Sequence, residues 1–216
     1  MKFKGHKVLV IGDTHDSPKI PQDRFDWIGK HIRKTKPDYI VHIGDFSSFD
    51  SLSSFQKNDT QQGKLKDAFM VDIHSMRKAL KILDKYVRDY PHHICIGNHE
   101  LRIHKFEERI PEIEGIMKKT LYDSYKEYGG KNAEIQIGND SIHDLVFGHT
   151  HKARDWKAVK IGYNNWVRIV NVGCALPYGH IEEYARHNMN GWSWCITELA
   201  SIRSYWAYSK INCQDC

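Results

Sequence analysis

Short apolar runs alternate with longer amphipathic segments over the first part of the chain, and this alternation constrains the fold more than any other feature. Residues 7–11, 39–43 and 93–96 are compact β-branched runs that are predicted to be buried strands. Between them, residues 21–34 and 65–90 carry apolar residues at helical spacing. Strand–helix–strand units of this kind favour a largely parallel sheet at the centre of an α/β protein.

The rest of the chain is predicted to be helical and charged over residues 101–128, with a break at Pro111, and mainly β afterwards. No internal repeat, low-complexity segment or linker divides the sequence. We therefore expect a single domain over residues 1–216, whose last residues, including Cys213 and Cys216, form an unstructured tail. The predicted later strands are residues 145–147, a hairpin of residues 157–163 and 166–172, and a hairpin of residues 192–198 and 202–208.

Composition excludes several classes of protein. The chain has 216 residues, of which 40% are hydrophobic and 27% charged, and this balance rules out a disordered chain, a collagen-like repeat and a membrane bundle. No apolar run approaches the ~20 residues that cross a bilayer, and residues 1–12 lack the apolar core of a signal peptide. The five scattered cysteines are typical of reduced thiols. We expect a cytoplasmic protein without a membrane partner, whose net charge of +5 permits a polyanionic one.

Four predicted strands end in a glycine that is followed by a residue able to bind a metal. The carboxyl ends of parallel strands meet at one edge of a sheet, so these residues are expected to lie together. Taken singly, each has an ordinary explanation as a helix cap, a turn residue or a surface histidine, but one site for two metal ions explains all four. The motifs are Gly12-Asp13-Thr14-His15, Gly44-Asp45, Gly97-Asn98-His99-Glu100 and Gly148-His149-Thr150-His151.

The donor groups of these motifs are carboxylates, an amide and imidazoles. In an extended backbone, Asp13 and His15 point the same way, and so do His149 and His151. This mixture suits Mn²⁺, Fe or Zn²⁺, because it is too rich in nitrogen for Ca²⁺ and lacks the thiolates of structural zinc sites. Two ions that share one ligand need roughly seven protein donors. The sequence offers six, namely Asp13, His15, Asp45, Asn98, His149 and His151.

In this order, the four motifs resemble those of the calcineurin-like metallophosphoesterase superfamily. Residues 44–102 are especially similar to its small phage and bacterial members, and the stretch Val170-Asn171-Val172-Gly173 fits as well. The resemblance implies mixed central β-sheets, arranged like a β-sandwich and flanked by helices. It also implies two divalent metal ions, with Mn²⁺ expected first and Fe or Zn²⁺ as alternatives, and a shared hydroxide that attacks phosphorus.

The resemblance further implies roles for the matching residues. His99 is expected to protonate or steady the leaving oxygen, and Asp45 to bridge the two ions. Asn98 is also expected to contact the substrate phosphate. Apart from the resemblance, Arg102 lies one helical turn or less from His99, so it is expected to bind the phosphate too, with a solvated surface arginine as the alternative. The first ion is expected on Asp13, His15, Asp45 and His151, and the second on Asp45, Asn98, His149 and one further histidine.

The sequence departs from the family at two places. Members usually carry a histidine well upstream of the final Gly-His-x-His, and His143 is the best replacement for it here. Otherwise the second site is incomplete, or a water or a remote side chain fills it. Ser48 stands where many members have an acidic or amide residue that orients the catalytic histidine. Asp50 can serve instead, or it is a solvated loop carboxylate.

We therefore expect a metal-dependent phosphoesterase that hydrolyses phosphomonoesters or phosphodiesters, and the mild basicity favours nucleotides or DNA as substrates. A DNA or RNA nuclease of the same fold is one alternative. It would need basic residues in a groove that leads to the metals. The other alternative is a binding protein that keeps the fold but has lost turnover. The candidate basic residues for a nuclease are Lys30, Arg33, Arg77, Lys78 and Lys152.

Overall fold

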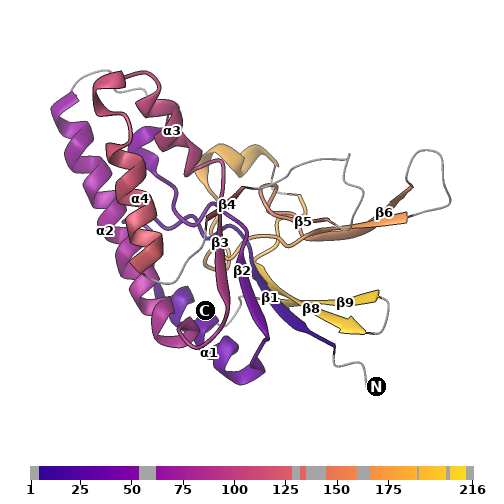
Figure 1. Cartoon of the computed structure of the whole chain (residues 1–216). Helices are drawn as coiled ribbons and strands as arrows, with labels where there is room; N and C mark the ends of the chain where they lie inside the picture. The colour runs from indigo at the N-terminus through magenta and orange to yellow at the C-terminus, as the bar shows by residue number, and fades with distance from the viewer. Residues whose placement is uncertain are drawn as a thin grey trace.

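The computed structural model describes residues 5–53, 62–127, 132–134, 145–159, 166–188, 190–202 and 205–212. Its elements follow the predicted order along the chain (Figure 1). The strands are β1 (Lys7–Ile11), β2 (Tyr39–His42), β3 (His92–Ile96), β4 (Asn132–Glu134), β5 (Leu145–Phe147), β6 (Arg154–Val159), β7 (Trp166–Asn171), β8 (Cys195–Ile202) and β9 (Tyr205–Asn212). The α-helices are α1 (Asp23–Thr35), α2 (Gln62–Val87), α3 (Leu101–Glu107) and α4 (Ile116–Glu127).

The strands form two sheets, and this arrangement confirms the predicted α/β fold with mixed sheets flanked by helices. The larger sheet has the order β4-β3-β2-β1-β8-β9. Strands β1 to β4 are parallel to one another, whereas β8 and β9 are antiparallel to their neighbours. The smaller sheet has the order β5-β7-β6. Among the helices that the structure describes, none combines the length and the apolar character needed to cross a membrane.

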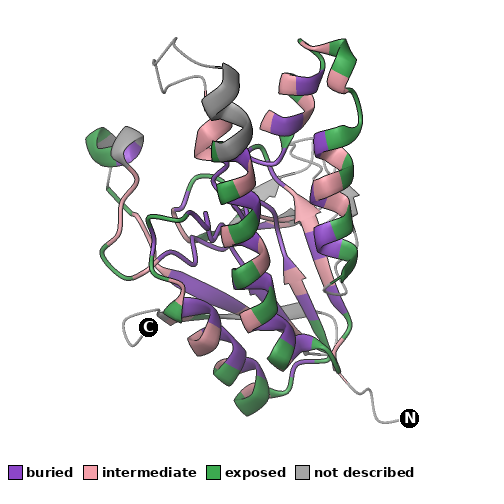
Figure 2. Ribbon diagram, turned by 90° about the vertical axis from the view of Figure 1, so that its left-hand side faces the viewer, coloured by how far each residue is buried: buried purple, intermediate pink, exposed green. Residues whose placement is uncertain are grey.

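The larger sheet is covered on both faces, which explains why β1 is apolar at nearly every position. Leu9 and Ile11 belong to the main core, which they share with Phe25 and other residues of the helices. Val10 belongs to a second cluster, which includes Val170 of the smaller sheet. Successive side chains of a strand point to opposite faces, so a strand between two layers buries both sets. In Figure 2 the helices carry buried residues toward the sheet and exposed residues on their outer faces.

One prediction about the sheet is wrong. The motif that begins at Gly148 follows β5, and β5 belongs to the smaller sheet. The four glycine motifs therefore do not lie at the edge of one parallel sheet. Instead, three motifs end strands of the larger sheet and the fourth approaches them from the smaller sheet. The packing of the two sheets on each other brings the motifs together, and this packing has no local sequence signal.

The last hairpin is confirmed, but the predicted limits of both strands are wrong, since the second strand runs from Tyr205 to Asn212. The first strand begins at Cys195 and continues to Ile202, so it does not include the two preceding tryptophans. Trp194 forms an isolated bridge with Cys174, and its indole N–H donates to the His180 carbonyl at 2.7 Å. Trp192 and Trp194 therefore pack against Cys174, which forms a bridge with Asp13 just after β1. Their alternate spacing does not arise from a strand.

Two histidines lie in the core with ring nitrogens that lack a hydrogen-bond partner within the described part of the chain, His42 at Nδ1 and His92 at both nitrogens. Burial lowers the pKa of His42 from 6.5 to about 3 and that of His92 from 6.5 to about 4. The unfolded chain therefore binds protons more readily than the folded protein. The stability that the two neutral histidines contribute is complete above pH 6.5, and it is lost as the pH falls toward their pKa values in the folded protein.

Replacing His92 by leucine is expected to reduce this acid sensitivity. Between pH 7 and pH 4.5, the free energy of unfolding should fall by about 2–3 kcal/mol through each of the two buried histidines, and His92→Leu should remove one of these losses. Urea denaturation of chelator-treated protein at both pH values measures the difference. His74→Gln, which changes an exposed histidine on α2, is the control. An equal acid loss in wild type and His92→Leu would contradict the prediction.

Candidate metal centre

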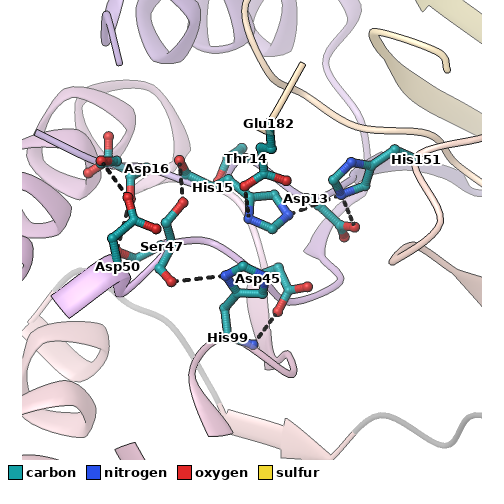
Figure 3. Close-up of polar contacts among 12 residues, drawn as sticks. Asp13, Thr14, His15, Asp16, Asp45, Ser47, Asp50, His99, His151 and Glu182 are labelled. Atoms are coloured by element: carbon teal, nitrogen blue, oxygen red, sulfur yellow. Dashed lines mark hydrogen bonds and ion pairs between the residues drawn. The ribbon is translucent and has the colours of Figure 1, made fainter. Parts of the chain in front are cut away.

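Asp13, His15 and His151 bring three atoms that can bind a metal close together in the interior. His15 Nε2 lies 3.0 Å from His151 Nε2, and His151 Nε2 lies 3.0 Å from Asp13 Oδ2. None of the three residues is more than 1% exposed. Figure 3 shows the two rings and the carboxylate turned toward one another. The structure thus brings together three of the four residues expected around the first ion.

Left-handed backbone turns direct the histidines of this group. The φ angle is 43° at His15, 75° at His149 and 55° at His151. The prediction that an extended backbone points the paired side chains the same way is therefore wrong. The turn at His15 is held by its backbone N–H, which donates to the Asp45 carbonyl at 2.9 Å. Such conformations are uncommon for residues other than glycine and occur often at functional sites.

A second group shares His15 with the first and adds Asp45 and His99. The donor atoms of these three residues all lie within 4.8 Å of one another. The His15 and His99 rings are nearly perpendicular, with centroids 4.3 Å apart. The backbone N–H of His99 donates to Asp45 Oδ1 at 2.8 Å, as the dashed line in Figure 3 shows. The four residues of the first expected ion are thus all within one buried cluster.

The chemistry of this cluster fits a bound divalent cation. Burial raises the pKa of Asp45, and the neighbouring Asp13 carboxylate raises it further. Burial also lowers the pKa of His15, as does the nearby His99 ring. Both shifts disfavour the charge that each side chain carries in water. A divalent cation would stabilise the carboxylates and bind the lone pairs of neutral imidazoles, so the donor set suits such an ion.

Two motif glycines give the carboxylates the space they need. A Cβ atom at Gly97 would lie 2.2 Å from Asp45 Oδ1, and one at Gly148 would lie 2.3 Å from Asp13 Oδ1. Both distances are far shorter than a van der Waals contact, so any larger residue would displace the carboxylate or the backbone. The glycines are therefore part of the site because they allow the close approach of the loops.

Gly148→Ala is expected to weaken Mn²⁺ binding by about tenfold or more, because the new methyl group displaces the Asp13 carboxylate. Overpacking should also lower the free energy of unfolding by about 1–3 kcal/mol. Calorimetric titration with Mn²⁺ and urea denaturation measure the two effects. Gly29→Ala is the matched control, since its Cβ would lie 2.1 Å from the Tyr86 ring, away from the metal centre. It should lose stability and keep its affinity. Unchanged affinity in Gly148→Ala would contradict the prediction.

Asn98 and His149 lie on the wall of a cavity of about 820 Å³, and both are exposed. The backbone N–H of His149 donates to Asp13 Oδ2 at 2.6 Å, so the main chain of this motif contacts the buried cluster directly. His143 lies outside the described residues, so its role as the missing ligand stays a prediction. The other residues that line the cavity are Ser17, Lys19, Ile20, Ser48, Asp50, Ser53, His99, Arg102, His180, Ile181, Glu182 and Arg186.

A backbone carbonyl, that of Ser48, orients His99. His99 Nδ1 lies 2.9 Å from this oxygen, and Arg102 also donates to it at 2.7 Å. The Arg102 guanidinium lies 3.3 Å from His99 Nε2 as well. Burial, followed by the charge of Arg102, lowers the pKa of His99 from 6.5 to about 3. Asp50 accepts a hydrogen bond from Ser17 instead, so the interpretation of Asp50 as the residue that orients His99 is wrong.

Glu100 holds the loops of the site together, a role that the sequence reasoning missed. Its buried carboxylate accepts hydrogen bonds from the backbone N–H groups of Asp45, Ser47 and Gly97, at 3.0, 3.1 and 2.9 Å. The loops after β2 and β3 are thereby tied to one side chain. The available signal was the place of Glu100 within the third glycine motif, but the loop that it binds is distant in the sequence.

Comparison with known proteins agrees with this geometry. A search of curated proteins finds no match to the chain. A family model described as calcineurin-like phosphoesterase matches residues 6–188, a stretch that contains every residue of the two buried donor groups. The model covers most of the chain, from the start of the first strand to the segment that follows the smaller sheet. The protein therefore belongs to the calcineurin-like phosphoesterase family.

Proposed function

We propose that the protein is a metal-dependent hydrolase of phosphoesters and that the buried cluster is its active site. The observation that carries the proposal is the 3.0 Å distance between His15 Nε2 and His151 Nε2, with Asp13 Oδ2 equally close to the latter. Two imidazole nitrogens and a carboxylate oxygen that converge in this way can share one cation through their lone pairs. Family membership supports the same chemistry, since the family is one of phosphoesterases.

Two divalent ions are proposed, with Asp45 as the ligand that both share. Mn²⁺, Fe and Zn²⁺ all accept this mixture of oxygen and nitrogen donors. When bound, the ions would supply the Lewis acidity that lowers the pKa of water and offsets the charge of the phosphoryl oxygens. The proposed ligands are Asp13, His15, Asp45 and His151 for the first ion, and Asp45, Asn98, His149 and His143 for the second.

His99, Arg102 and Asn98 are proposed to act on the substrate, because all three line the cavity beside the buried cluster. His99 Nδ1 is held by the Ser48 carbonyl, so Nε2, which the Arg102 guanidinium contacts at 3.3 Å, is the nitrogen proposed to meet the leaving oxygen. Arg102 places its charge beside His99 and retains further N–H groups that can bind a phosphate oxygen. Asn98 is exposed on the same wall and can donate its amide N–H to the phosphate.

A small phosphoester, either a monoester or a diester, fits the cavity better than a nucleic acid does. A volume of about 820 Å³ lies in the range of small-molecule sites. None of the five basic residues that a nuclease would need is among the described residues that line the cavity. Lys30 instead forms an ion pair with Asp26 of α1, Arg33 forms one with Asp89 just after α2, and Arg77 donates to a serine of α4. This placement does not favour the nuclease alternative.

Hydrolysis of p-nitrophenyl phosphate and bis(p-nitrophenyl) phosphate with Mn²⁺ tests the proposal. Purified protein should hydrolyse at least one of the two, lose the activity on chelation and regain it when Mn²⁺ is restored. Metal analysis of the same samples should give two ions per chain. Bound ions without turnover of either ester would favour the binding protein that has lost activity. No turnover together with fewer than two ions per chain would exclude the proposed enzyme.

A further inference from the structure

We propose that Glu182 is a positioning residue of the metal centre, which orients the His15 ring for metal binding; this inference rests on the proposed function. Glu182 Oε1 lies 3.2 Å from His15 Nδ1. The other nitrogen of the same ring, Nε2, lies 3.0 Å from His151 Nε2. His15 therefore stands between a carboxylate at one nitrogen and the proposed metal ligands at the other, as Figure 3 shows.

The carboxylate at Nδ1 favours one tautomer of the His15 ring. With the hydrogen on Nδ1, the lone pair of Nε2 points to the group that contains Asp13 and His151. Metal-binding histidines commonly direct their second ring nitrogen to a carboxylate, which fixes the ring and makes it a stronger donor. The contact has the length of an ion pair without the alignment of a hydrogen bond, and such contacts often tighten when a site is loaded.

The segment that carries Glu182 is anchored to the same site. The Ala175 N–H donates to the Asp13 carbonyl at 2.9 Å, and the Trp194 indole N–H donates to the His180 carbonyl at 2.7 Å. Glu182 follows two residues after the second of these anchors. Its side chain is 11% exposed, so the carboxylate lies within the cavity wall and does not extend into solvent. The backbone thus places Glu182 against His15 from a segment distant in the sequence.

A carboxylate on this wall would otherwise oppose the proposed reaction. Lys19, Arg102 and Arg186 line the same cavity, and their positive charges suit an anionic phosphoester. The negative charge of Glu182 repels such a substrate. Its contact with His15 Nδ1, however, places that charge behind the imidazole. A carboxylate in this position stabilises a cation bound at the other ring nitrogen.

Calorimetric titration of chelator-treated protein with Mn²⁺ tests this inference. In Glu182→Ala, the affinity of one of the two Mn²⁺ sites is expected to fall by about 10- to 100-fold, while the other keeps its wild-type value. Glu182→Gln retains an oxygen that can face His15 Nδ1, so it should recover part of the lost affinity. The electron paramagnetic resonance spectrum of bound Mn²⁺ should differ from that of the wild type more in Glu182→Ala than in Glu182→Gln. Asp50→Asn is the matched control, since Asp50 lines the same cavity but contacts Ser17.

The outcomes distinguish this inference from the proposed function. Wild-type affinity at both sites in Glu182→Ala would overturn the positioning role and leave the proposed function intact. Complete loss of one site in both Glu182→Ala and Glu182→Gln would overturn it too, because Glu182 would then be a direct ligand. Thermal unfolding of the metal-free variants separates misfolding from weak binding, and if Glu182→Ala does not fold, Glu182→Gln decides. A wild-type protein that binds no Mn²⁺, Fe²⁺ or Zn²⁺ would overturn both proposals, and if only one of these ions binds, the titration uses that ion.

Discussion

Hydrolysis is expected to fall by roughly 10³-fold when Asp45 is replaced by asparagine, because removal of several kcal/mol of transition-state stabilisation has this effect. Asp45 is the carboxylate proposed to bridge the two ions. Asparagine keeps an oxygen that can accept the His99 N–H, which lies 2.8 Å from Asp45 Oδ1 in the present structure. The substitution therefore removes the negative charge while preserving the contact. Metal analysis should show fewer than two ions per chain in the variant.

The same substitution is expected to stabilise the protein when no metal is bound. Burial and the neighbouring carboxylates of Asp13 and Glu100 raise the pKa of Asp45 above its ordinary value of 3.8. The folded protein therefore holds a proton on Asp45 more readily than the unfolded chain does. At neutral pH the cost of ionising Asp45 in the folded interior lowers the free energy of unfolding, and this cost disappears as the pH falls below 3.8. Asparagine has no charge, so the cost is absent at every pH.

Thermal unfolding at pH 7 with and without Mn²⁺ measures this reversal. Without metal, Asp45→Asn should unfold at a higher temperature than wild type, and with Mn²⁺ at a lower one, since ligands stabilise the state that binds them more tightly. Asp72→Asn is the control. It changes another buried carboxylate, which accepts hydrogen bonds from Ser51, and it should leave hydrolysis unchanged. Turnover near the wild-type rate in Asp45→Asn would contradict the proposed role.

The elements that follow local pattern could be predicted from the sequence. The limits of β1 and β5 coincide with the predicted strands, because short β-branched runs bounded by glycine have few alternatives. The helical region after β3 is interrupted between Glu107 and Ile116, a stretch that contains Pro111, as predicted. The close grouping of Asp13, His15 and Asp45 was also predicted, since each follows a strand of the larger sheet that ends in glycine.

The contacts that orient the site could not be predicted, because they arise between distant segments. The oxygen that orients His99 is the backbone carbonyl of Ser48, which every residue type provides, so no side-chain pattern marks it. Glu182 contacts His15 from a loop that is distant in the sequence. In the sequence alone it cannot be distinguished from an ordinary surface glutamate. The approach of the Gly148 motif depends on how two sheets pack, and a single sequence carries little information on such packing.

The second large effect is expected from His99→Ala, and it should depend on the leaving group. An aliphatic alcohol needs a proton as it leaves, whereas p-nitrophenolate leaves as an anion. Proton donation contributes about 10²- to 10⁴-fold, so the hydrolysis of an alkyl phosphoester should fall by that factor. The hydrolysis of the p-nitrophenyl ester should fall by less than about tenfold. Steady-state kinetics on both esters at saturating Mn²⁺ measure the two losses. His104→Ala is the control, because this histidine of α3 contacts Tyr122.

The difference between the losses of activity on the two esters shows whether His99 donates a proton or only orients the substrate. In the free protein its pKa is about 3, so at neutral pH the ring is uncharged and its Nδ1 faces the Ser48 carbonyl. Equal losses for both esters would therefore mean that the neutral ring only orients the substrate, and the proposed proton transfer would be excluded. A loss confined to the alkyl ester would mean that the negative charge of the bound phosphate raises the pKa of His99, because only a protonated Nε2 can deliver a proton while Nδ1 stays on the carbonyl.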